Sequence, residues 1–358
     1  MASYHLLENH ESFDSLLCVQ QLMKNPLASI PQRYIRLDDQ DPPITQNETL
    51  SPEIPTIDMK QLVSGEAMEL ELEKLHLACK DWGFFQLVNH GVSALVLEKL
   101  KDELQEFFKL PLEEKFKYKI RPGDVEGYGA LILSEDQKLD WGDRFYMVTN
   151  PLHTRKPHLF PELPSSLRTI LGSYILELQN LAMILLGSLA KVMKIDKKEI
   201  QDTFENGMQT MRITNYPPCP QPELVMGITA HSDASGITIL NQLNEVNGLQ
   251  LKKDGLWIPV NFISDALVVN IGDILEIMSN GIYKSVEHRA VVNSEKERLS
   301  VALFFNPKFE SEVGPSISLI NPQNPPLFKR IGMENYVKQF FSRKLDGKSN
   351  IEFMKIRS

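Results

Sequence analysis

The stretch HSDASGITIL, residues 231–240, places a histidine and an aspartate two positions apart, directly before an apolar run that is typical of a strand. Side chains alternate between the two faces of a strand, so His231 and Asp233 point to the same side if the strand begins near Thr229. The pair alone is a weak signal, because two polar residues at the mouth of an ordinary strand give the same pattern. A metal site needs a third ligand from elsewhere in the chain.

The second half of the chain consists of short β-branched runs separated by turn signals. We predict a strand in each of these runs from Met211 onward: MRITNY, GITIL, GLQLKK, LWIPV, ALVVNI, ILEIM, YKSVEHRAVV and RLSVALFF. Ser279-Asn280-Gly281 is predicted to form a hairpin turn between two of them, because Asn-Gly tolerates the positive φ angles that tight turns require. Short strands at regular spacing indicate a sandwich or a barrel.

The first half of the chain carries helical patterns. Apolar residues recur at helical spacing over residues 72–82, 97–108 and about 164–194, and two short strands, IPTIDM and FFQLVNH, interrupt them. The longest apolar run, Leu181–Ala190, is about half as long as a membrane span and therefore predicts a buried helix. Together the patterns predict an α+β fold with a mainly β core and with helices packed outside, largely from the N-terminal half.

Charge and cysteine content restrict the class of protein. Lys and Arg number 38 against 47 Asp and Glu, which gives a net charge of −9, and no basic cluster tracks a phosphate backbone. The three cysteines are far apart and lack metal-ribbon spacing, so we expect reduced thiols. The opening residues lack the pattern of an export signal. We therefore expect a cytoplasmic protein, a monomer, with neither nucleic acid nor a membrane as a partner.

The best candidate for a third ligand is His288 in KSVEHRAV. Two imidazoles and one carboxylate on one face of an ion leave its other face open, which is the arrangement of non-haem Fe(II) oxygenases. A lone histidine on a strand is more often a hydrogen-bonded structural residue. Zinc also accepts two histidines and a carboxylate, so a zinc hydrolase is a competing interpretation.

A second pair of polar residues lies two apart on a predicted strand, Arg298 and Ser300 in ERLSVALFF. A guanidinium binds a carboxylate through two parallel hydrogen bonds, and a serine hydroxyl can add a third. The pair therefore suits an anionic small molecule. The alternative is a surface salt bridge between Arg298 and its neighbours Glu295 and Glu297.

These motifs resemble those of the plant 2-oxoglutarate- and Fe(II)-dependent dioxygenases. The matching blocks, in the order and spacing of that family, are IPTIDM, ACKDWGFFQLVNHG, NYPPCPQP, HSD, the later His288 and RLS. The resemblance covers roughly residue 30 to the C-terminus. SEDQKLDW, RKPHLFP and KLDGKS look closest to the senescence-related and alkaloid O-demethylase-like group.

The resemblance implies a double-stranded β-helix, or jelly roll, in which His231, Asp233 and His288 bind Fe(II). It further implies 2-oxoglutarate as co-substrate, O2 as oxidant and ascorbate as a supporting reductant. The reaction would hydroxylate or O-demethylate a small, largely apolar specialised metabolite, such as a plant alkaloid, with succinate and CO2 as co-products. A non-catalytic small-molecule-binding protein on the same fold is the alternative.

The resemblance also assigns the co-substrate site. Arg298 and Ser300 would hold the distal carboxylate of 2-oxoglutarate, and Tyr216 of NYPPCP would add its phenol. Thr214 departs from the family, because it stands where an asparagine often contacts the co-substrate. Some relatives with a small hydroxylated residue there are active oxidases, so the change does not argue for an inactive site.

The residues that contact the substrate are harder to predict. Alternation from Ser300 places Phe304 and Asn306 on its side of the strand, and Phe304 could stack on an aromatic substrate or pack in the core. Further substrate candidates, from the segment that often overhangs the mouth of the site in the family, are Tyr128, Phe145 and Tyr146. Ala130 and Leu131, which replace residues common in the group, are expected to shape the pocket.

The chain is expected to form one structural unit of four segments, because no linker demands a domain cut. These are an N-terminal arm over 1–53, a helix-rich region over 54–205, the jelly-roll core over 206–310 and a C-terminal helical segment over 311–358.

Overall fold

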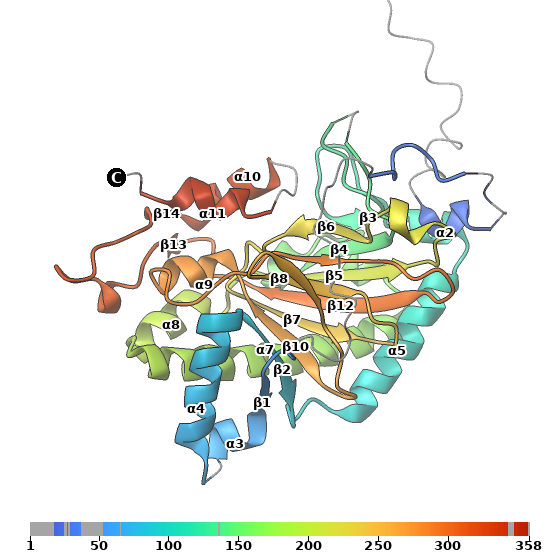
Figure 1. Ribbon diagram of the computed structural model, residues 1–358. Helices are drawn as coiled ribbons and strands as arrows, with labels where there is room; N and C mark the ends of the chain where they lie inside the picture. Colours follow the sequence, from blue (N-terminus) through green and yellow to red (C-terminus); the bar gives the residue numbers. More distant parts are fainter. Residues whose placement is uncertain are drawn as a thin grey trace, which may run out of the picture.

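Two β-sheets form the centre of the molecule, and long helices pack beside the larger one (Figure 1). The structure is a computed structural model that describes residues 18–24, 27, 29–36, 53–64, 66–134, 137–342 and 347–356. Side chains from both sheets meet in one apolar cluster, to which β2 and β10 contribute Phe84 and Val268, and β8 contributes Leu251. This architecture confirms the predicted jelly roll with a mainly β core.

The larger sheet has eight strands. In spatial order they are β1 (Thr56–Asp58), β2 (Phe84–Val88), β10 (Leu267–Ile271), β7 (Ile237–Gln242), β12 (Arg298–Phe305), β5 (Gln209–Tyr216), β4 (Asp143–Asn150) and β3 (Gly127–Tyr128). Only the β1–β2 pair is parallel. Strands from the first half of the chain form both edges, and strands from the second half form the centre.

Two smaller sheets complete the β structure of the described residues. The four-stranded sheet has the order β6 (Ile228–His231), β11 (His288–Ala290), β8 (Leu249–Lys253) and β9 (Leu256–Pro259). A two-stranded sheet pairs β13 (Glu312–Val313) with β14 (Ile331–Gly332). The six predicted strands MRITNY, GITIL, GLQLKK, LWIPV, ALVVNI and RLSVALFF are confirmed as β5, β7, β8, β9, β10 and β12.

The helices of the described residues lie mostly outside the sheets (Figure 1). The α-helices are α2 (Val19–Leu22), α3 (Met59–Ser64), α4 (Met68–Leu77), α5 (Ala94–Lys109), α6 (Leu112–Phe116), α7 (Ser165–Met193), α8 (Lys197–Phe204), α9 (Asp273–Met278), α10 (Met333–Phe341) and α11 (Ser349–Met354). Shorter turns are η1 (Ala78–Trp82, a π-helix), η2 (Leu152–Thr154), η3 (Phe160–Glu162), η4 (Pro222–Leu224) and η5 (Ile317–Leu319). The three helices predicted in the first half are confirmed as α4 with η1, α5 and α7.

The long helix α7 packs against the sheet. It is long and apolar enough, by length and composition alone, to cross a membrane. It instead contacts β7 and β12 on one side and α4, α5 and α8 on the others. Its stripe of buried residues includes Leu178, Leu181, Leu185 and Leu189, in agreement with the predicted buried helix.

One predicted strand and its hairpin are wrong. The run ILEIM forms the buried helix α9, and β11 begins only at His288. A short apolar run bounded by turn residues fits a buried helix as well as a strand, because periodicity cannot separate them at this length. Asn280 and Gly281 do adopt positive φ angles, of 51° and 81°, but they turn the chain after α9 instead of closing a hairpin.

The predicted segment boundaries stay predictions. Most of the arm over 1–53 lies outside the described residues, and its described part includes the short helix α2. Strands of the regions 54–205 and 206–310 share the larger sheet, through the pairs β2–β10 and β4–β5.

Candidate active site

The predicted ligands His231, Asp233 and His288 meet at one end of the four-stranded sheet. His231 ends β6, His288 begins β11, and the two residues are paired in register. One ligand atom from each of the three residues lies within 4.8 Å of the others. Asp233 follows β6 in the connection to β7, so it reaches the site through a turn and not through strand alternation.

Hydrogen bonds orient both imidazole rings. His231 Nδ1 lies 2.7 Å from the Thr229 carbonyl oxygen, and His288 Nδ1 lies 3.1 Å from that of Val286. A carbonyl oxygen can only accept, so each Nδ1 carries the proton and donates it. In a neutral ring the lone pair then lies on Nε2, and the two Nε2 atoms lie 3.5 and 3.6 Å from Asp233 Oδ1. Such hydrogen bonds fix the tautomer that a metal ion requires.

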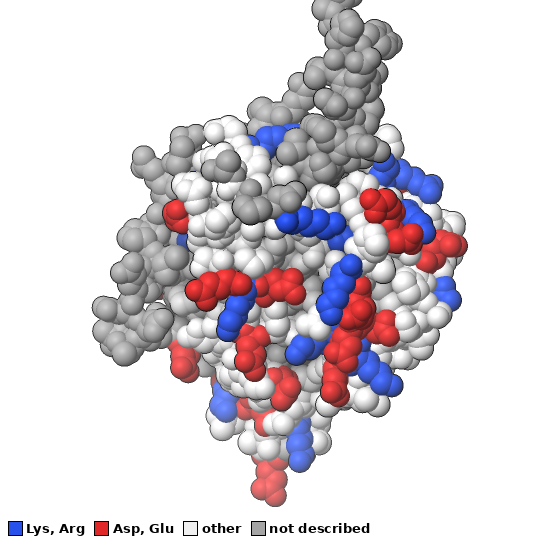
Figure 2. Space-filling model, turned by 90° about the vertical axis from the view of Figure 1, so that its right-hand side faces the viewer, with Lys and Arg blue, Asp and Glu red and all other residues white. Residues whose placement is uncertain are grey.

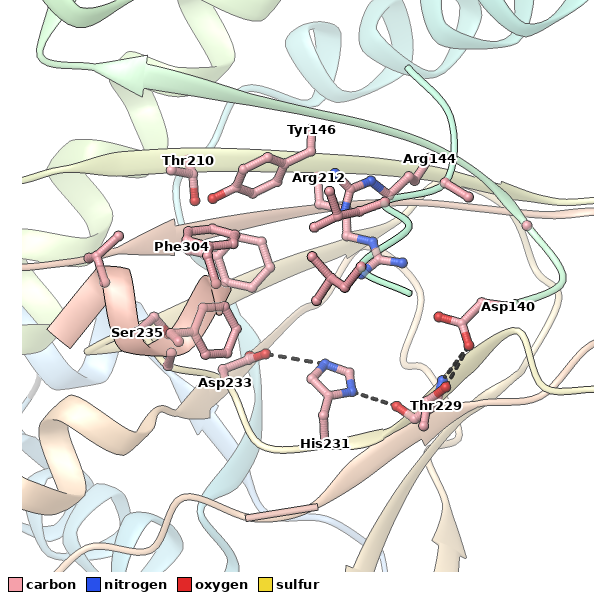
Figure 3. A pocket seen from close by; sticks show the side chains of 18 of the residues that line it. Asp140, Arg144, Tyr146, Thr210, Arg212, Thr229, His231, Asp233, Ser235 and Phe304 are labelled. Atoms are coloured by element: carbon pink, nitrogen blue, oxygen red, sulfur yellow. Dashed lines mark hydrogen bonds and ion pairs between the residues drawn. The ribbon is translucent and has the colours of Figure 1, made fainter. Parts of the chain in front are cut away.

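The carboxylate of Asp233 is held in the same way. Its Oδ2 accepts hydrogen bonds from Thr238 Oγ1 at 2.6 Å and from Asn270 Nδ2 at 2.8 Å. Oδ1 is left to face the two histidines (Figure 3). The two neighbouring strands β7 and β10 thus position the third ligand.

The electrostatics of the three side chains suit a cation. Burial is the main cause that lowers the pKa of His288 to about 4. Asp233 opposes the shift and His231 adds to it, and the imidazole is therefore neutral at neutral pH. Burial opposes ionisation of Asp233, but the two histidines and Asn270 bring its pKa below the ordinary value. Two imidazoles and one carboxylate fit a divalent ion bound on one face.

A small cavity of about 70 Å³ between the two sheets contains all three ligands and the predicted carboxylate clamp. Arg298 and Ser300 of β12 are paired in register with Tyr216 and Thr214 of β5, so the four side chains share one face. Arg298 donates to Ser300 Oγ at 3.2 Å and to Gln242 Oε1 at 3.1 Å. Its guanidinium carbon lies 5.1 Å from the centre of the Tyr216 ring.

Arg298 points inward. Among the residues that the structure describes, no ion pair involves Arg298, although Glu297 precedes it. Its exposed fraction is 2%, so the surface salt bridge considered from the sequence is absent there. A desolvated guanidinium beside a hydroxyl and a phenol is suited to a carboxylate ligand.

A larger cavity of about 420 Å³ opens on the other side of His231 and Asp233. Phe304 and Asn306 line it, as do Ala130 and Leu131. The C-terminal helix α10 closes one side with apolar side chains, those of Val337, Phe340 and Phe341.

Tyr128 and Phe145, predicted as substrate residues, lie in the hydrophobic core. Their exposed fractions are 1% and 0%, and Phe145 stacks on Phe107 with ring centres 5.4 Å apart. Alternation along β4 explains the difference, because it turns Arg144 and Tyr146 to the cavity and the intervening Phe145 to the core. Tyr146, the third residue of this group, does line the cavity.

Several cavity residues were not predicted from the sequence, chiefly Arg144 of β4 and Arg212 of β5 (Figure 3). A signal for Arg212 was present: it alternates with Thr214 and Tyr216 in MRITNY and therefore shares their face. Thr214, the departure from the family, accepts a hydrogen bond from Arg212 Nε at 3.2 Å.

Comparison with known proteins agrees with this geometry. Residues 207–307 match the family model of the 2OG-Fe(II) oxygenase superfamily. Residues 54–163 match the family model described as "non-haem dioxygenase in morphine synthesis N-terminal". Codeine O-demethylase of Papaver somniferum is 52% identical over 96% of this chain and 96% of its own length. Oxoglutarate-dependent flavonoid 7-O-demethylase 1 of Ocimum basilicum is 51% identical over 95% of this chain and 91% of its own.

A solved structure also matches over nearly the whole fold. The crystal structure of JOX2 in complex with 2OG, Fe and JA superposes with a TM-score of 0.85 at 36% identity, covering 95% of this chain and 98% of that one.

Proposed function

Because the chain belongs to the 2OG-Fe(II) oxygenase superfamily, we propose that it removes an O-methyl group from a small, largely apolar specialised metabolite. The chain is a 2-oxoglutarate- and Fe(II)-dependent oxygenase, and its relatives of about 50% identity include enzymes named as O-demethylases of a flavonoid and of codeine. The main support for the proposal is the position of His231 and Asp233 at the junction of two cavities, a small one that contains the Arg298 clamp and a larger one with room for a substrate.

We assign the Fe(II) site to His231, Asp233 and His288. The donor set, the tautomers fixed by backbone carbonyls and the open side toward both cavities support this assignment. With 2-oxoglutarate and O2, bound iron supplies an oxidation that inserts one oxygen atom into a substrate C–H bond and releases succinate and CO2. If that carbon belongs to an O-methyl group, the resulting hemiacetal separates into formaldehyde and a free hydroxyl.

We assign the co-substrate site to Arg298, Ser300 and Tyr216. The planar guanidinium fork would bind the distal carboxylate of 2-oxoglutarate through parallel hydrogen bonds, with the Ser300 hydroxyl beside it. Gln242 holds the guanidinium through Nε, and the Ser300 hydroxyl accepts a hydrogen bond from the outer nitrogen Nη1. This arrangement would direct the opposite end of the co-substrate toward the three ligands, which line the same cavity.

The larger cavity would hold the substrate. Phe304 offers an aromatic face next to the ligands, and the apolar side chains of α10 exclude water from the opposite side. Asn306 adds one polar group. A site of this size and composition suits a compact, mostly apolar molecule with few polar groups.

The test is whether oxidation of 2-oxoglutarate is coupled to demethylation of a substrate. Purified protein with Fe(II), ascorbate, O2 and 2-oxoglutarate is incubated with methoxylated flavonoids and alkaloids, and succinate and formaldehyde are measured together. We expect equal amounts of both with at least one compound. His231→Ala should abolish both products, while His153→Ala, which alters an exposed histidine outside both cavities, should not. Failure of every methoxylated compound to raise succinate release would contradict the proposal.

We further propose that the protein is a cytoplasmic monomer that needs neither nucleic acid nor a membrane, with ascorbate as a supporting reductant. Acidic and basic side chains are mixed on the face in Figure 2, which supports the absence of a nucleic-acid partner. The alternative of a non-catalytic binder is not favoured, because an intact triad beside a carboxylate clamp serves no purpose in simple binding.

A further inference from the structure

Three arginines line the larger cavity, and the proposed reaction uses none of them. Arg36 is paired with Asp140, which leaves Arg144 and Arg212 to be explained. Arg144 of β4 and Arg212 of β5 both line the cavity, on the wall that faces His231 (Figure 3). The register pairs Arg144 with Thr214 and Tyr146 with Arg212, so the two arginines are diagonal neighbours on one face of adjacent strands. Their positions are fixed by the sheet and not by a flexible loop.

Neither guanidinium has an acidic partner. Arg144 donates one hydrogen bond, from Nη2 to the Val125 carbonyl oxygen at 2.7 Å, and its Nε is buried with no partner. Arg212 donates from Nε to Thr214. Within the described part of the chain, no ion pair involves either residue. Both arginines are half-buried. A charge that is partly removed from water and has no counter-charge is costly, so a site that keeps two of them is suited to an anion.

Asp140, an acid in the lining of the same cavity, is already bonded elsewhere. Asp140 Oδ1 accepts from Thr229 N at 3.0 Å, from Thr229 Oγ1 at 2.6 Å and from Arg36 at 3.0 Å. Burial, followed by repulsion from Arg212, lowers the pKa of Arg144 to about 9, so the group keeps its charge at neutral pH. Two positive charges therefore share one wall of the cavity, while Phe304 and the apolar side chains of α10 line other parts of it.

We propose that the substrate carries a carboxylate, which Arg144 and Arg212 bind while the apolar body of the molecule packs against Phe304 and α10. Two planar guanidinium forks match the two oxygens of a carboxylate. The inference deepens the proposed function and rests on it, since it names the chemical class of the molecule that is oxidised.

Binding of 2-oxoglutarate does not explain why Arg144 and Arg212 lie together in the larger cavity. Arg212 lines both cavities, but Arg144 lines only the larger one, and the smaller cavity has its own carboxylate clamp in Arg298 and Ser300. A carboxylate anchored on β4 and β5 would fix which end of the substrate faces His231 and Asp233. Arg144 and Arg212 would thus be specificity-determining residues.

The experiment compares acids with their uncharged esters. The probes are 4-methoxycinnamate, 4-methoxyphenylacetate and 6-methoxy-2-naphthylacetate, each paired with its methyl ester. Calorimetry measures binding to protein loaded with Mn(II) and 2-oxoglutarate in the absence of O2, so that no turnover is needed. We expect at least one acid to bind about 10-fold or more tightly than its ester, as charge-assisted hydrogen bonds require.

Variants locate the effect. Arg144→Met and Arg212→Met should lower the affinity for the acid about 10- to 100-fold and leave that for the ester unchanged. Arg168→Met, which removes an exposed arginine of α7 outside both cavities, is the charge-matched control and should retain the preference. Arg144→Lys keeps the charge but not the planar guanidinium, so it should retain part of the preference for the acid over the ester. This variant replaces Arg144→Met if the methionine variant does not fold.

The outcomes separate this inference from the proposed function. Acid preference without succinate release under Fe(II) and O2 supports the carboxylate site and contradicts O-demethylation. Succinate release with neutral compounds, together with no acid preference, supports the reaction and overturns the inference. Wild-type protein that binds no acid more tightly than its ester overturns it as well. Arg212→Met that weakens only 2-oxoglutarate binding would assign Arg212 to the co-substrate and overturn the paired site.

Discussion

His231 and His288 face each other across the antiparallel pair of β6 and β11, with ring centres 4.4 Å apart. Each ring donates its Nδ1 proton to a backbone carbonyl two residues earlier in the chain. The geometry of the two nitrogen ligands is therefore built from backbone pairing, and only the carboxylate ligand depends on side chains of other strands.

Thr238→Val tests that dependence. The variant keeps the shape of the side chain but removes the hydroxyl that donates to Asp233 Oδ2 at 2.6 Å. Loss of such a supporting hydrogen bond is expected to lower metal affinity by about 10-fold or more. Competition between the protein and a chelator for Co(II) measures it. Thr169→Val, at an exposed helical hydroxyl, is the control. Unchanged affinity would show that Asn270 alone is enough to hold the carboxylate.

Arg298→Lys tests the co-substrate clamp. Lysine keeps the positive charge but cannot form two parallel hydrogen bonds with one carboxylate. We expect the KM for 2-oxoglutarate to rise about 10- to 100-fold, with a smaller change in kcat at saturation. Steady-state succinate formation at varied 2-oxoglutarate gives both constants. A wild-type KM in the variant would remove Arg298 from the proposed site. Arg168→Lys on the surface of α7 should change neither constant.

Asp273→Asn tests a pH dependence of stability. Burial raises the pKa of Asp273 from 3.8 to about 6, although Ser285, Ser232, Lys348 and Asn350 oppose the shift. Between these values the folded state binds the proton more tightly than the unfolded state does. The contribution of this group to the free energy of unfolding is therefore present at low pH and is lost as the pH rises through about 6.

The asparagine variant should remove that loss. Relative to wild type, its free energy of unfolding should gain about 1–3 kcal/mol between about pH 4.5 and pH 7.5. Urea unfolding at both pH values measures the difference. Asp202→Asn, at an exposed acid of α8, should show no such gain. If the free energy of unfolding changed with pH by the same amount in wild type and in Asp273→Asn, the raised pKa would be contradicted.

Gly272→Ala tests the turn that carries Asp233. A Cβ on Gly272 would lie 2.1 Å from the Ser235 carbonyl oxygen, so the backbone would have to move. The same turn is held by hydrogen bonds from Gly272 N to Gly236 O at 2.9 Å and from Asp273 N to Asp233 O at 2.7 Å. We expect a loss of about 1–3 kcal/mol in stability, together with weaker metal binding.

Calorimetric melting with and without Co(II) checks both effects. Gly172→Ala is a matched control on α7, because its Cβ would meet no atom within 4 Å. Alanine is the better helix former, so this variant should be stabilised by up to about 1 kcal/mol. A Gly272→Ala protein as stable as wild type would mean that the Ser235 turn can shift freely.

Strand alternation predicted the part of the site that lies on one strand. Arg298, Ser300 and Phe304 share a face because β12 is regular over its whole length, and the sequence pattern shows that directly. The metal triad required two distant segments to meet, the HSD stretch and the start of β11. For that step the resemblance to known oxygenases was necessary, because spacing along the chain says nothing about which turn brings Asp233 beside His288.

The errors arose where a local pattern had two physical solutions. ILEIM, residues 274–278, became the buried helix α9. Its one polar residue, Glu276, is buried like its neighbours and therefore marks no exposed face. Phe145 and Tyr146 are adjacent aromatics on one strand, so only one of them can face the cavity, and the partner strand β5 decides which. Arg144 was overlooked because its role depends on Arg212, which is close to it only in the folded protein.

The order of strands in the larger sheet has a consequence for synthesis on the ribosome. The edge of β2 that faces the centre of the sheet pairs with β10, which is made only after β5, β7, β8 and β9. Until then, that edge has exposed backbone donors and acceptors that can pair with another chain. Newly made protein should therefore depend on chaperones for most of its translation, and the yield of soluble enzyme should rise when translation is slowed or chaperones are co-expressed.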